Sequence, residues 1–446
     1  MVPDRRTLIM VITAAVICIA AAFALVAFSG SANDAPEPES TTSETVKTPA
    51  ETLDPPSAEP AATAGKSGAT ATELPPQTAA GAGEELYEAE TAPITPETAD
   101  PNLTQDETVT KQPAETAAAP PEPSLLDSLT LEEKLGLMFM VRYSEETAGY
   151  PFGSYILFAK DFENETPESI AAKLAALRAE SKTGILTAVD EEGGTVVRIS
   201  RFPAFRSSRF LSPRALYAKG DMDAVTADTA EKAQLLHRLG ISMNLAPVAD
   251  ISDSPDDFMY KRSVGLDAAG TSEFVRRVIE TSREYGVLSA VKHFPGYGAA
   301  ADTHTGMVRD SRSLETLLAS DLIPFKAAVE ADVGAIMLSH IIADAIDREK
   351  PVSVSEKAVA FIREEMGYDG VIITDDLGME GITAYCRTGS AALEAVMAGC
   401  DLLCCSDPDD FQTVLTAVKD GRISEERIDE SAARILGLIA EAQPDN

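Results

Sequence analysis

Two of the chain's four histidines fall between Lys292 and His304, close to a carboxylate. His293 follows an apolar, strand-like run over 287–291, and His304 lies two residues after Asp302. A carboxylate beside a histidine orients the ring and favours its protonated form, which is a common arrangement for a general acid/base. The intervening residues are rich in glycine and alanine, so we expect the acid/base to lie on a loop that closes over a bound substrate.

Polar residues follow several other apolar runs in the same way. They are Asp190 and Arg198 after 185–189, Asp250 and Arg262 after 242–247, His340 after 335–338, and Asp375 and Asp376 after 371–374. Unrelated surface salt bridges would explain any one of these positions. The carboxyl ends of parallel barrel strands meet on one face, so the whole set favours a shared site.

Apolar runs and helical patterns alternate along this part of the chain. The expected strands are 154–158, 185–189, 242–247, 287–291, 335–338, 371–374 and 402–405. Continuous apolar runs separated by helices are typical of a parallel sheet that is buried on both faces. The length and the number of strands favour an α/β fold of the (β/α)8 TIM-type barrel class over a doubly wound sheet. No glycine-rich nucleotide-binding motif follows the first strands.

Capping signals mark where the helices begin and end. Thr130 and Glu133 form a capping box that opens a first helix, which we expect to include Leu135, Met138 and Phe139. Thr166 and Pro167 open a second helix. Further helices are expected to end at three glycines, which are Gly240, Gly286 and Gly399.

Composition divides the chain into three predicted parts. Residues 1–32 hold two arginines followed by an apolar run, which predicts a transmembrane anchor or a cleaved signal sequence. Residues 33–124 are rich in Pro, Thr, Ala and Glu and predict a disordered linker. Residues 125–446 form the expected single catalytic domain. The domain would then lie outside the cell, tethered by one membrane span, or be secreted.

The charge and cysteine content limit the partners. With 37 basic and 72 acidic residues, the chain is a poor match for nucleic acid, and we expect membrane contact only through the N-terminal helix. The five cysteines form no disulfide framework, and Cys404 and Cys405 are expected to be reduced core residues. No cysteine or histidine cluster points to a metal or a cofactor, and the oligomeric state is not indicated.

Five motifs in this order make the chain resemble family 3 glycoside hydrolases, specifically their β-N-acetylhexosaminidase branch. They are Asp190-Glu-Glu-Gly-Gly with Arg198, Asn244-Leu-Ala-Pro-Val-Ala-Asp250, Lys292-His-Phe-Pro-Gly296, Asp302-Thr-His304 and Thr374-Asp-Asp-Leu-Gly-Met379. The resemblance covers essentially all of residues 125–446. It implies a retaining exo-glycosidase with a saccharide substrate and no cofactor.

The resemblance also implies roles for individual residues. Asp375 matches the nucleophile, His304 the acid/base and Asp302 its carboxylate partner. The residues matching those that hold the sugar are Asp190, Arg198, Arg262, Lys292 and His293. Asp376 is expected to point to the opposite side of its strand as a structural residue, His340 to support the site, and His237 to be an ordinary helix residue.

The loop from Tyr297 to His304 departs from the family pattern, because it is one residue shorter and lacks the family's first His and its Asp-Thr. Thr195 also stands where Arg is common. The leading interpretation is hydrolysis of terminal non-reducing β-N-acetylglucosamine, for example in cell-wall-derived saccharides. The alternatives are a β-glucosidase, a glycoside phosphorylase, and a catalytically silent, membrane-tethered glycan-binding protein. The chain has no tryptophan, which favours a pocket over a long aromatic-lined cleft.

Overall fold

Eight parallel strands form one sheet in the computed structural model, which describes residues 124–144, 147, 149–298, 306–386 and 389–442. The order is β10-β1-β2-β3-β4-β5-β7-β9. The strands are β1 (Phe139–Arg142), β2 (Ser154–Leu157), β3 (Leu186–Val189), β4 (Met243–Asn244), β5 (Leu288–Phe294), β7 (Ala335–Leu338), β9 (Val371–Thr374) and β10 (Leu403–Cys404). A parallel bridge between Ile373 and Leu402 joins the two edge strands. The sheet is therefore a nearly closed barrel, as the alternating pattern predicts.

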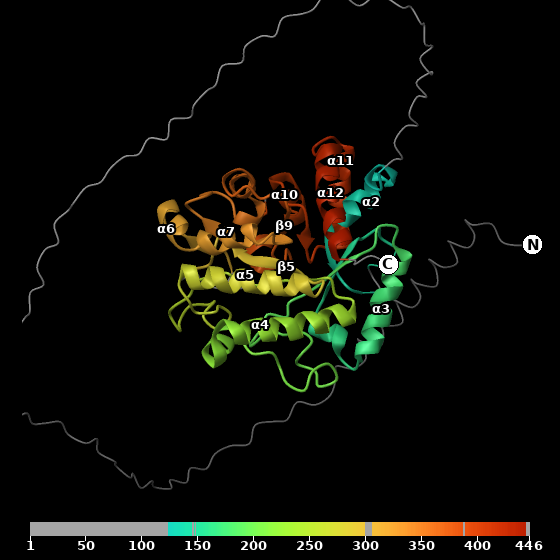
Figure 1. The fold of residues 1–446 in the computed structure, drawn as a ribbon. Coiled ribbons are helices and arrows are strands. Elements are labelled where there is room, and N and C mark those ends of the chain that lie inside the picture. Colours follow the sequence, from blue (N-terminus) through green and yellow to red (C-terminus); the bar gives the residue numbers. More distant parts are fainter. Residues whose placement is uncertain (1–123, 145–146, 148, 299–305, 387–388, 443–446) are drawn as a thin grey trace, which may run out of the picture. The chain divides into compact units, whose positions relative to one another are not determined.

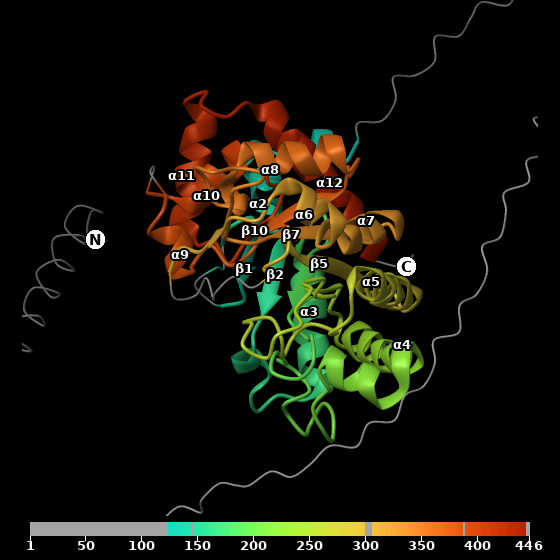
Figure 2. The same ribbon diagram turned by 90° about the vertical axis from the view of Figure 1, so that its left-hand side faces the viewer.

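Helices surround this barrel (Figures 1 and 2). The α-helices are α2 (Leu131–Leu137), α3 (Pro167–Glu180), α4 (Pro213–Leu239), α5 (Ala268–Glu284), α6 (Leu314–Ala319), α7 (Leu322–Glu330), α8 (Glu356–Ala360), α9 (Glu380–Thr383), α10 (Ala391–Ala398), α11 (Pro408–Lys419) and α12 (Glu425–Ala442). Helices α4 and α5 lie side by side in both views, and α12 packs against α2. The chain thus covers the outer face of the parallel sheet with helices that its own crossovers supply.

Short elements complete the described fold. They are the 3-10 turns η1 (Leu126–Ser128), η3 (Ala159–Phe162) and η5 (Val352–Val354), the π-helical turn η6 (Phe361–Glu365), and a small parallel pair of β6 (Arg309–Asp310) with β8 (Ile342–Ala343). The pair lies in the connections that precede and follow β7. It ties these two connections together outside the barrel.

The predicted capping residues act as expected at several helix ends. Thr130 accepts a hydrogen bond from the N–H of Glu133 in a capping box, and Thr166 caps α3 with Pro167 at its first position. Gly240 (φ 77°) ends α4 in the left-handed region that glycine tolerates. Gly399 (φ 106°) does the same for α10. The residue types at these positions therefore determine where the helices begin and end.

Two boundaries differ from the sequence expectation. Helix α2 ends at Leu137, so Met138 is its C-cap, and Phe139 begins β1 instead of continuing the helix. A short apolar run does not distinguish a buried strand from a buried helix, and here pairing with β2 and β10 decides for the strand. Helix α5 has Tyr285 at its C-cap, one residue before Gly286.

The first two predicted parts of the chain, residues 1–32 and 33–124, lie outside the described residues except for Ser124. Among the helices that are described, none is both long and apolar enough to cross a membrane. The anchor and the linker therefore stay predictions.

Candidate active site

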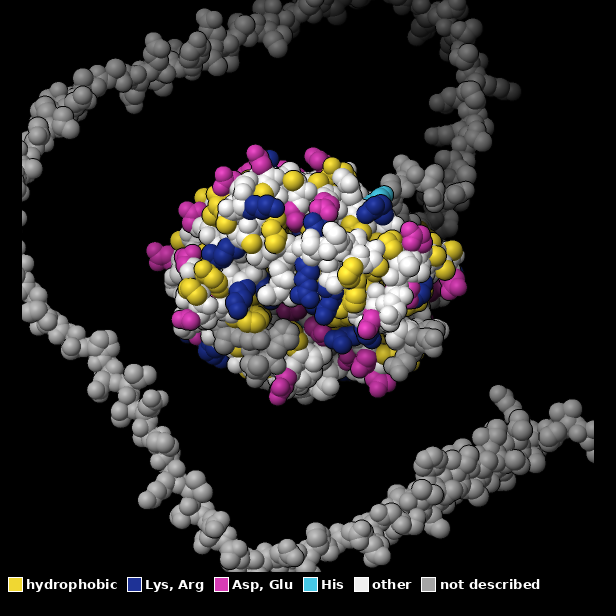
Figure 3. Space-filling model, turned by 90° about the horizontal axis from the view of Figure 1, so that it is seen from below, with side chains coloured by type: hydrophobic (Ala, Val, Ile, Leu, Met, Phe, Trp, Pro, Cys, Tyr) yellow, Lys and Arg dark blue, Asp and Glu magenta, His cyan; other side chains and the backbone are white. Residues whose placement is uncertain are grey.

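A cavity of about 460 Å³ opens at the carboxyl ends of the barrel strands. Six residues that the sequence assigns to the site line it: Asp190, Arg198, Arg262, Lys292, His293 and Asp375. Figure 3 shows one face of the molecule, on which Lys and Arg side chains gather near the centre around acidic side chains. The cavity is lined by a similar mixture of basic and acidic residues. The other two predicted residues, Asp302 and His304, lie outside the described residues. The fold thus brings all six described residues to one cavity.

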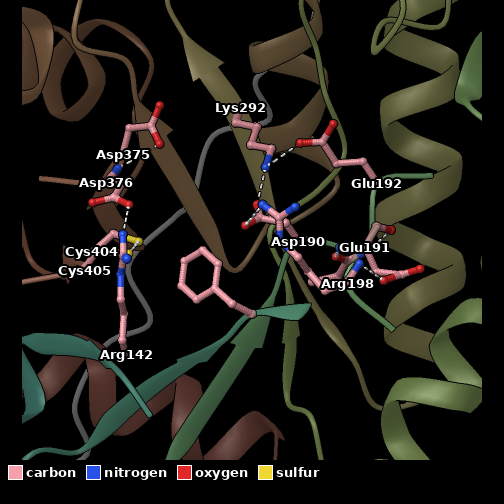
Figure 4. Close-up of polar contacts among 12 residues, drawn as sticks. Arg142, Asp190, Glu191, Glu192, Arg198, Lys292, Asp375, Asp376, Cys404 and Cys405 are labelled. Atoms are coloured by element: carbon pink, nitrogen blue, oxygen red, sulfur yellow. Dashed lines mark hydrogen bonds and ion pairs between the residues drawn. The ribbon is translucent and has the colours of Figure 1, made fainter. Parts of the chain in front are cut away.

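Lys292 lies at the centre of an ion-pair network on one wall (Figure 4). Its Nζ is 2.7 Å from Oδ1 of Asp190 and 2.8 Å from Oε1 of Glu192, and the residue is only 2% exposed. Burial alone would lower the pKa of Lys292, but the two carboxylates raise it above its ordinary value. The ammonium group is therefore charged, and it holds Asp190 toward the cavity.

Glu192 also pairs with Arg262 in a bidentate arrangement. Nε and Nη2 of Arg262 donate to Oε2 and Oε1 of Glu192 at 2.9 and 2.6 Å. Burial would raise the pKa of Glu192, but Arg262 and Lys292 outweigh it and hold that pKa well below its usual range. One buried carboxylate therefore pairs with two cations of the site and positions both of them.

His293 is held between Asp250 and Arg262. Its Nδ1 is 2.7 Å from Oδ2 of Asp250, and its Nε2 is 3.1 Å from Nη2 of Arg262. A guanidinium group can only donate, so Nε2 must accept and Nδ1 must donate to Asp250. The two partners thereby set both the tautomer and the orientation of the ring.

Glu191 and Asn244 shape the segment that carries Arg198. The buried carboxylate of Glu191 accepts hydrogen bonds from the backbone N–H groups of Arg198, Ile199 and Ser200 at 2.7, 2.8 and 3.2 Å. Asn244 in β4 bonds the backbone N–H and C=O of Glu191 at 3.0 and 3.2 Å. Arg198 then reaches Asp190 at 3.4 Å, while its Nε is buried without a partner among the described residues.

Asp375 follows the last residue of β9 and is partly exposed to the cavity. Its backbone N–H donates to Leu338 O at 3.0 Å, and its Oδ1 accepts from the N–H of Asp376 at 2.8 Å. Burial would raise the pKa of Asp375, but His340, the Asp376 N–H and Lys292 lower it below its ordinary value. The carboxylate is therefore ionised and fixed at a rigid strand end, as a nucleophile requires.

The expectation that Asp376 points away from the site is wrong, because Asp376 lines the same cavity as Asp375. Its Oδ2 accepts from Nη2 of Arg142 at 2.6 Å, and its Oδ1 accepts from the N–H of Gly378 at 2.8 Å. Strand β9 ends at Thr374, so the alternation of side chains in a strand no longer applies at Asp376.

The remaining described histidines take the places expected of them. His340 is fully buried, and its ring nitrogens lie 2.7 Å from Ser353 Oγ and 2.9 Å from the backbone oxygen of Asp376. It therefore supports the turn at Asp375 through the backbone of the next residue, Asp376. His237 is an exposed residue of α4.

The cysteine prediction is only partly correct. All four cysteines in the described ranges are free, and Cys404 is buried in β10. Cys405 is partly exposed, however, and both residues line the cavity. Nowhere in the described ranges do three His, Cys, Asp or Glu side chains gather as potential metal ligands.

Three residues that shape the site have no individual role in the sequence-based prediction. Asp250 is among the strand-end residues expected to share a site, whereas Glu191 and Glu192 appear only within the Asp190-Glu-Glu-Gly-Gly motif. A signal was present, since each directly follows or closely trails a buried strand. The sequence could not tell which carboxylate of the 190–192 run faces which cation, because their partners lie as many as 102 residues away.

The fold and the cavity define a (β/α)8-type barrel with a deep, charged pocket at the carboxyl ends of its strands. The model of the glycosyl hydrolase family 3 N terminal domain matches residues 130–438. The chain therefore belongs to glycosyl hydrolase family 3, which confirms the resemblance.

Relatives agree with this assignment. The chain is 31% identical over 326 residues to β-hexosaminidase A of Pseudoalteromonas piscicida, an alignment that covers 66% of this chain and 54% of the relative. It is 31% identical over 275 residues to a β-hexosaminidase of Methylococcus capsulatus, covering 60% and 80%. A solved family 3 β-N-acetylglucosaminidase from Paenibacillus sp. str. FPU-7 superposes with a TM-score of 0.65 at 31% identity, covering 70% and 63%. The chain thus matches about half the length of the first of these relatives.

Proposed function

We propose that this protein is a retaining exo-glycosidase that releases terminal non-reducing β-N-acetylglucosamine residues, with cell-wall-derived saccharides as the substrate class. The observation that carries the proposal is the shared placement of the ionised Asp375 and the Asp190–Lys292–Glu192–Arg262 network around one cavity. The β-hexosaminidase names of the relatives support the choice of sugar.

Asp375 is the proposed nucleophile. Retention at an anomeric carbon needs a carboxylate that attacks from one face, forms a glycosyl-enzyme ester and is later displaced by water. The lowered pKa of Asp375 keeps this carboxylate ionised before attack. Its backbone hydrogen bond to Leu338 ties it to β7, so that attack requires little reorganisation.

The charged wall formed by Asp190 and Lys292 lies across the cavity from Asp375 (Figure 4) and suits recognition of a single sugar ring. Asp190 presents a carboxylate that accepts hydroxyl protons, and Lys292 and Arg198 present donors. His293 lines the cavity and is held in one tautomer and one orientation by Asp250 and Arg262. A pocket of about 460 Å³ is of a size for one or two sugar rings, which favours exo-action.

His304 is the proposed proton donor, with Asp302 as its partner. The leaving oxygen needs a proton in the first step, and the attacking water must lose one in the second. A histidine held by a carboxylate can perform both transfers. This assignment is based on the Asp302-Thr-His304 motif alone.

The proposed place of action is outside the cell, with the domain tethered through residues 1–32 or released after their cleavage. The apolar run after Arg5 and Arg6, followed by the Pro- and Thr-rich stretch, supports this location. Protease accessibility of the domain on intact cells, with and without detergent, tests it. Protection in intact cells would contradict an extracellular domain.

Chromogenic aryl substrates test the activity. We expect release from aryl β-N-acetylglucosaminide with a higher kcat/KM than from aryl β-glucoside, and no stimulation by inorganic phosphate. Preference for the glucoside would identify a β-glucosidase, and a phosphate-dependent sugar phosphate product would identify a phosphorylase. Saccharide binding without turnover of either substrate would indicate a silent glycan-binding protein.

A further inference from the structure

Cys404 and Cys405 place two thiols side by side on the wall of the cavity. Successive side chains of a strand normally point to opposite faces. Cys404 ends β10, and Cys405 adopts φ 60°, a left-handed conformation that is uncommon for residues other than glycine. This backbone turn brings the two Sγ atoms to 3.7 Å from each other, and both residues line the cavity (Figure 4).

Backbone hydrogen bonds fix this pair to the turn that carries Asp375. The N–H of Cys404 donates to Oγ1 of Thr374 at 3.0 Å, and the oxygen of Cys404 accepts from the N–H of Leu377 at 3.0 Å. The N–H of Cys405 donates to Met140 O at 2.8 Å. The sulfur atoms are therefore held in place by three neighbouring segments instead of lying on a free loop.

Arg142 connects the thiol pair to the acidic turn. Its guanidinium pairs with Oδ2 of Asp376 at 2.6 Å (Figure 4), and the neighbouring Cys405 side chain and Asp376 raise the pKa of Arg142 against the opposing effect of burial. Cys405 is partly exposed, whereas Cys404 is buried. The hydrogen bond with Cys405, together with burial, raises the pKa of Cys404. Cys405 is thus the thiol that a reagent in the cavity reaches first, with Cys404 behind it as a second ligand.

We propose that Cys404 and Cys405 form a dithiol site that binds one soft, thiophilic centre, of the trivalent arsenic class, through both sulfur atoms. Two sulfur atoms bonded at about 2.3 Å to one centre lie about 3.4 Å apart for the narrow bond angles of pyramidal arsenic and about 3.8 Å apart for tetrahedral angles, and the observed separation of 3.7 Å falls within this range. A disulfide would require about 2.0 Å. Soft sulfur ligands select soft centres, so hard oxygen-seeking cations are not expected to bind.

The chemistry with phenylarsine oxide balances without an oxidant. Each thiol sulfur forms a bond to arsenic, the arsenic–oxygen bonds break, and the oxygen leaves as water with the two thiol protons. Arsenic stays trivalent throughout. The bound phenylarsenic group would occupy the cavity beside Asp375 and Asp376 and displace Arg142 from Cys405. Binding itself does not depend on the proposed glycosidase function; only the inhibition that follows from it does.

Intact-mass measurement on the full-length, reduced chain tests the binding. One equivalent of phenylarsine oxide should add one phenylarsenic group per molecule, which survives excess monothiol and is removed by a dithiol. Alkylation after denaturation should then find Cys404 and Cys405 protected, and Cys18, Cys386 and Cys400 modified. Retention should be lost in Cys405→Ala and in Cys404→Ser, and unchanged in the matched control Cys386→Ala. Equal retention in Cys405→Ala, or no retention by the wild-type protein, would overturn the proposal.

An activity measurement distinguishes the proposed dithiol site from the proposed glycosidase function. With aryl β-N-acetylglucosaminide, one equivalent should lower the wild-type rate at least tenfold, and a dithiol should restore it. The fraction of activity remaining should stay near one for Cys405→Ala, judged against that variant's own untreated rate. A protein that binds one equivalent yet has no glycosidase activity would contradict the proposed function and leave the dithiol site intact.

Discussion

Asp250 bonds His293 through one carboxylate oxygen and the start of the following loop through the other. Oδ2 accepts from Nδ1 of His293 at 2.7 Å, and Oδ1 accepts from the backbone N–H of Tyr297 at 2.7 Å. Asp250 is only 1% exposed and lies in the segment after β4, whereas His293 lies in β5. One buried side chain therefore fixes both the histidine ring and the backbone at Tyr297.

Asp250→Asn tests this relationship. An amide offers one acceptor oxygen, so its NH2 group must face either the His293 ring or the Tyr297 N–H, both of which are donors. We expect kcat/KM to fall about 10–100-fold and the free energy of unfolding to fall by about 1.5–3 kcal/mol. Kinetics and denaturant unfolding measure both. The exposed Asp253→Asn in the same segment is the matched control, and equal effects from the two variants would contradict a specific role.

Asp375→Asn should remove the nucleophile and leave the fold intact. Activity should fall on the order of 10³-fold or more, because no other carboxylate can form the ester in the same place. Thermal unfolding should change little, since Asp375 is partly exposed. A slow fluorinated glycoside should trap an ester that peptide mapping locates at Asp375. An ester found on Asp376 instead would move the nucleophile to the neighbouring residue.

Glu192→Gln should destabilise the protein strongly at neutral pH. The change leaves Lys292 and Arg262 buried without their shared charge partner, which should lower the free energy of unfolding by about 3–5 kcal/mol. The folded-state pKa of Glu192 is held below its ordinary value of 4.5. Its stabilisation is therefore fully present above about pH 4.5 and is lost as pH falls toward the folded-state pKa.

Urea unfolding of both proteins from pH 7 down to pH 3 measures this difference. The difference in the free energy of unfolding between wild type and Glu192→Gln should become smaller only in the acidic part of the range. The exposed-pair variant Glu231→Gln, which removes the partner of Arg206 on the surface, is the control and should cost no more than about 1 kcal/mol. A gap that stays constant with pH would exclude Glu192 as the titrating group.

His304→Ala should slow substrates according to their leaving groups. Glycosides with poor leaving groups need a proton to depart and should lose about 10²–10⁴-fold, whereas aryl glycosides with acidic phenols should lose much less in the glycosylation step. Asp302→Ala should show a weaker form of this pattern. Its pH–rate profile should shift downward, because loss of a nearby anion lowers the imidazole pKa. Pre-steady-state kinetics distinguishes the steps, and equal losses on both substrate types would give His304 a structural role.

A shortened chain that begins at Ser124 should fold and act without the preceding residues. The capping box at Thr130 and the packing of α2 against α12 lie entirely within this region. We expect the same midpoint of thermal unfolding and the same kcat/KM as for the chain from residue 33. An unfolded short chain beside an active longer one would show that residues 33–123 contribute to the domain.

Much of the fold could be predicted from the sequence, because its signals are local. Apolar runs marked seven of the eight barrel strands, and capping residues such as Thr130 and Gly240 marked helix ends. Because parallel strands deliver their carboxyl ends to one face, the order of motifs also predicted that Asp190, Lys292 and Asp375 would share a cavity. The sugar-binding roles of Asp190 and Lys292 and the nucleophilic role of Asp375 stay predictions.

Features that depend on contacts between distant parts of the chain were determined only by the tertiary structure. Phe139 became a strand residue because it pairs with Leu403 of β10 and the residues after it pair with β2, although its local pattern fits a helix equally well. The sequence alone could not assign Glu192 to Arg262, because these residues are 70 positions apart and three neighbouring acidic side chains compete for the cation. Asp376 and Cys405 entered the cavity because each lies just past the end of a strand. At such positions strand periodicity no longer applies, and long-range backbone hydrogen bonds set the direction of the side chain.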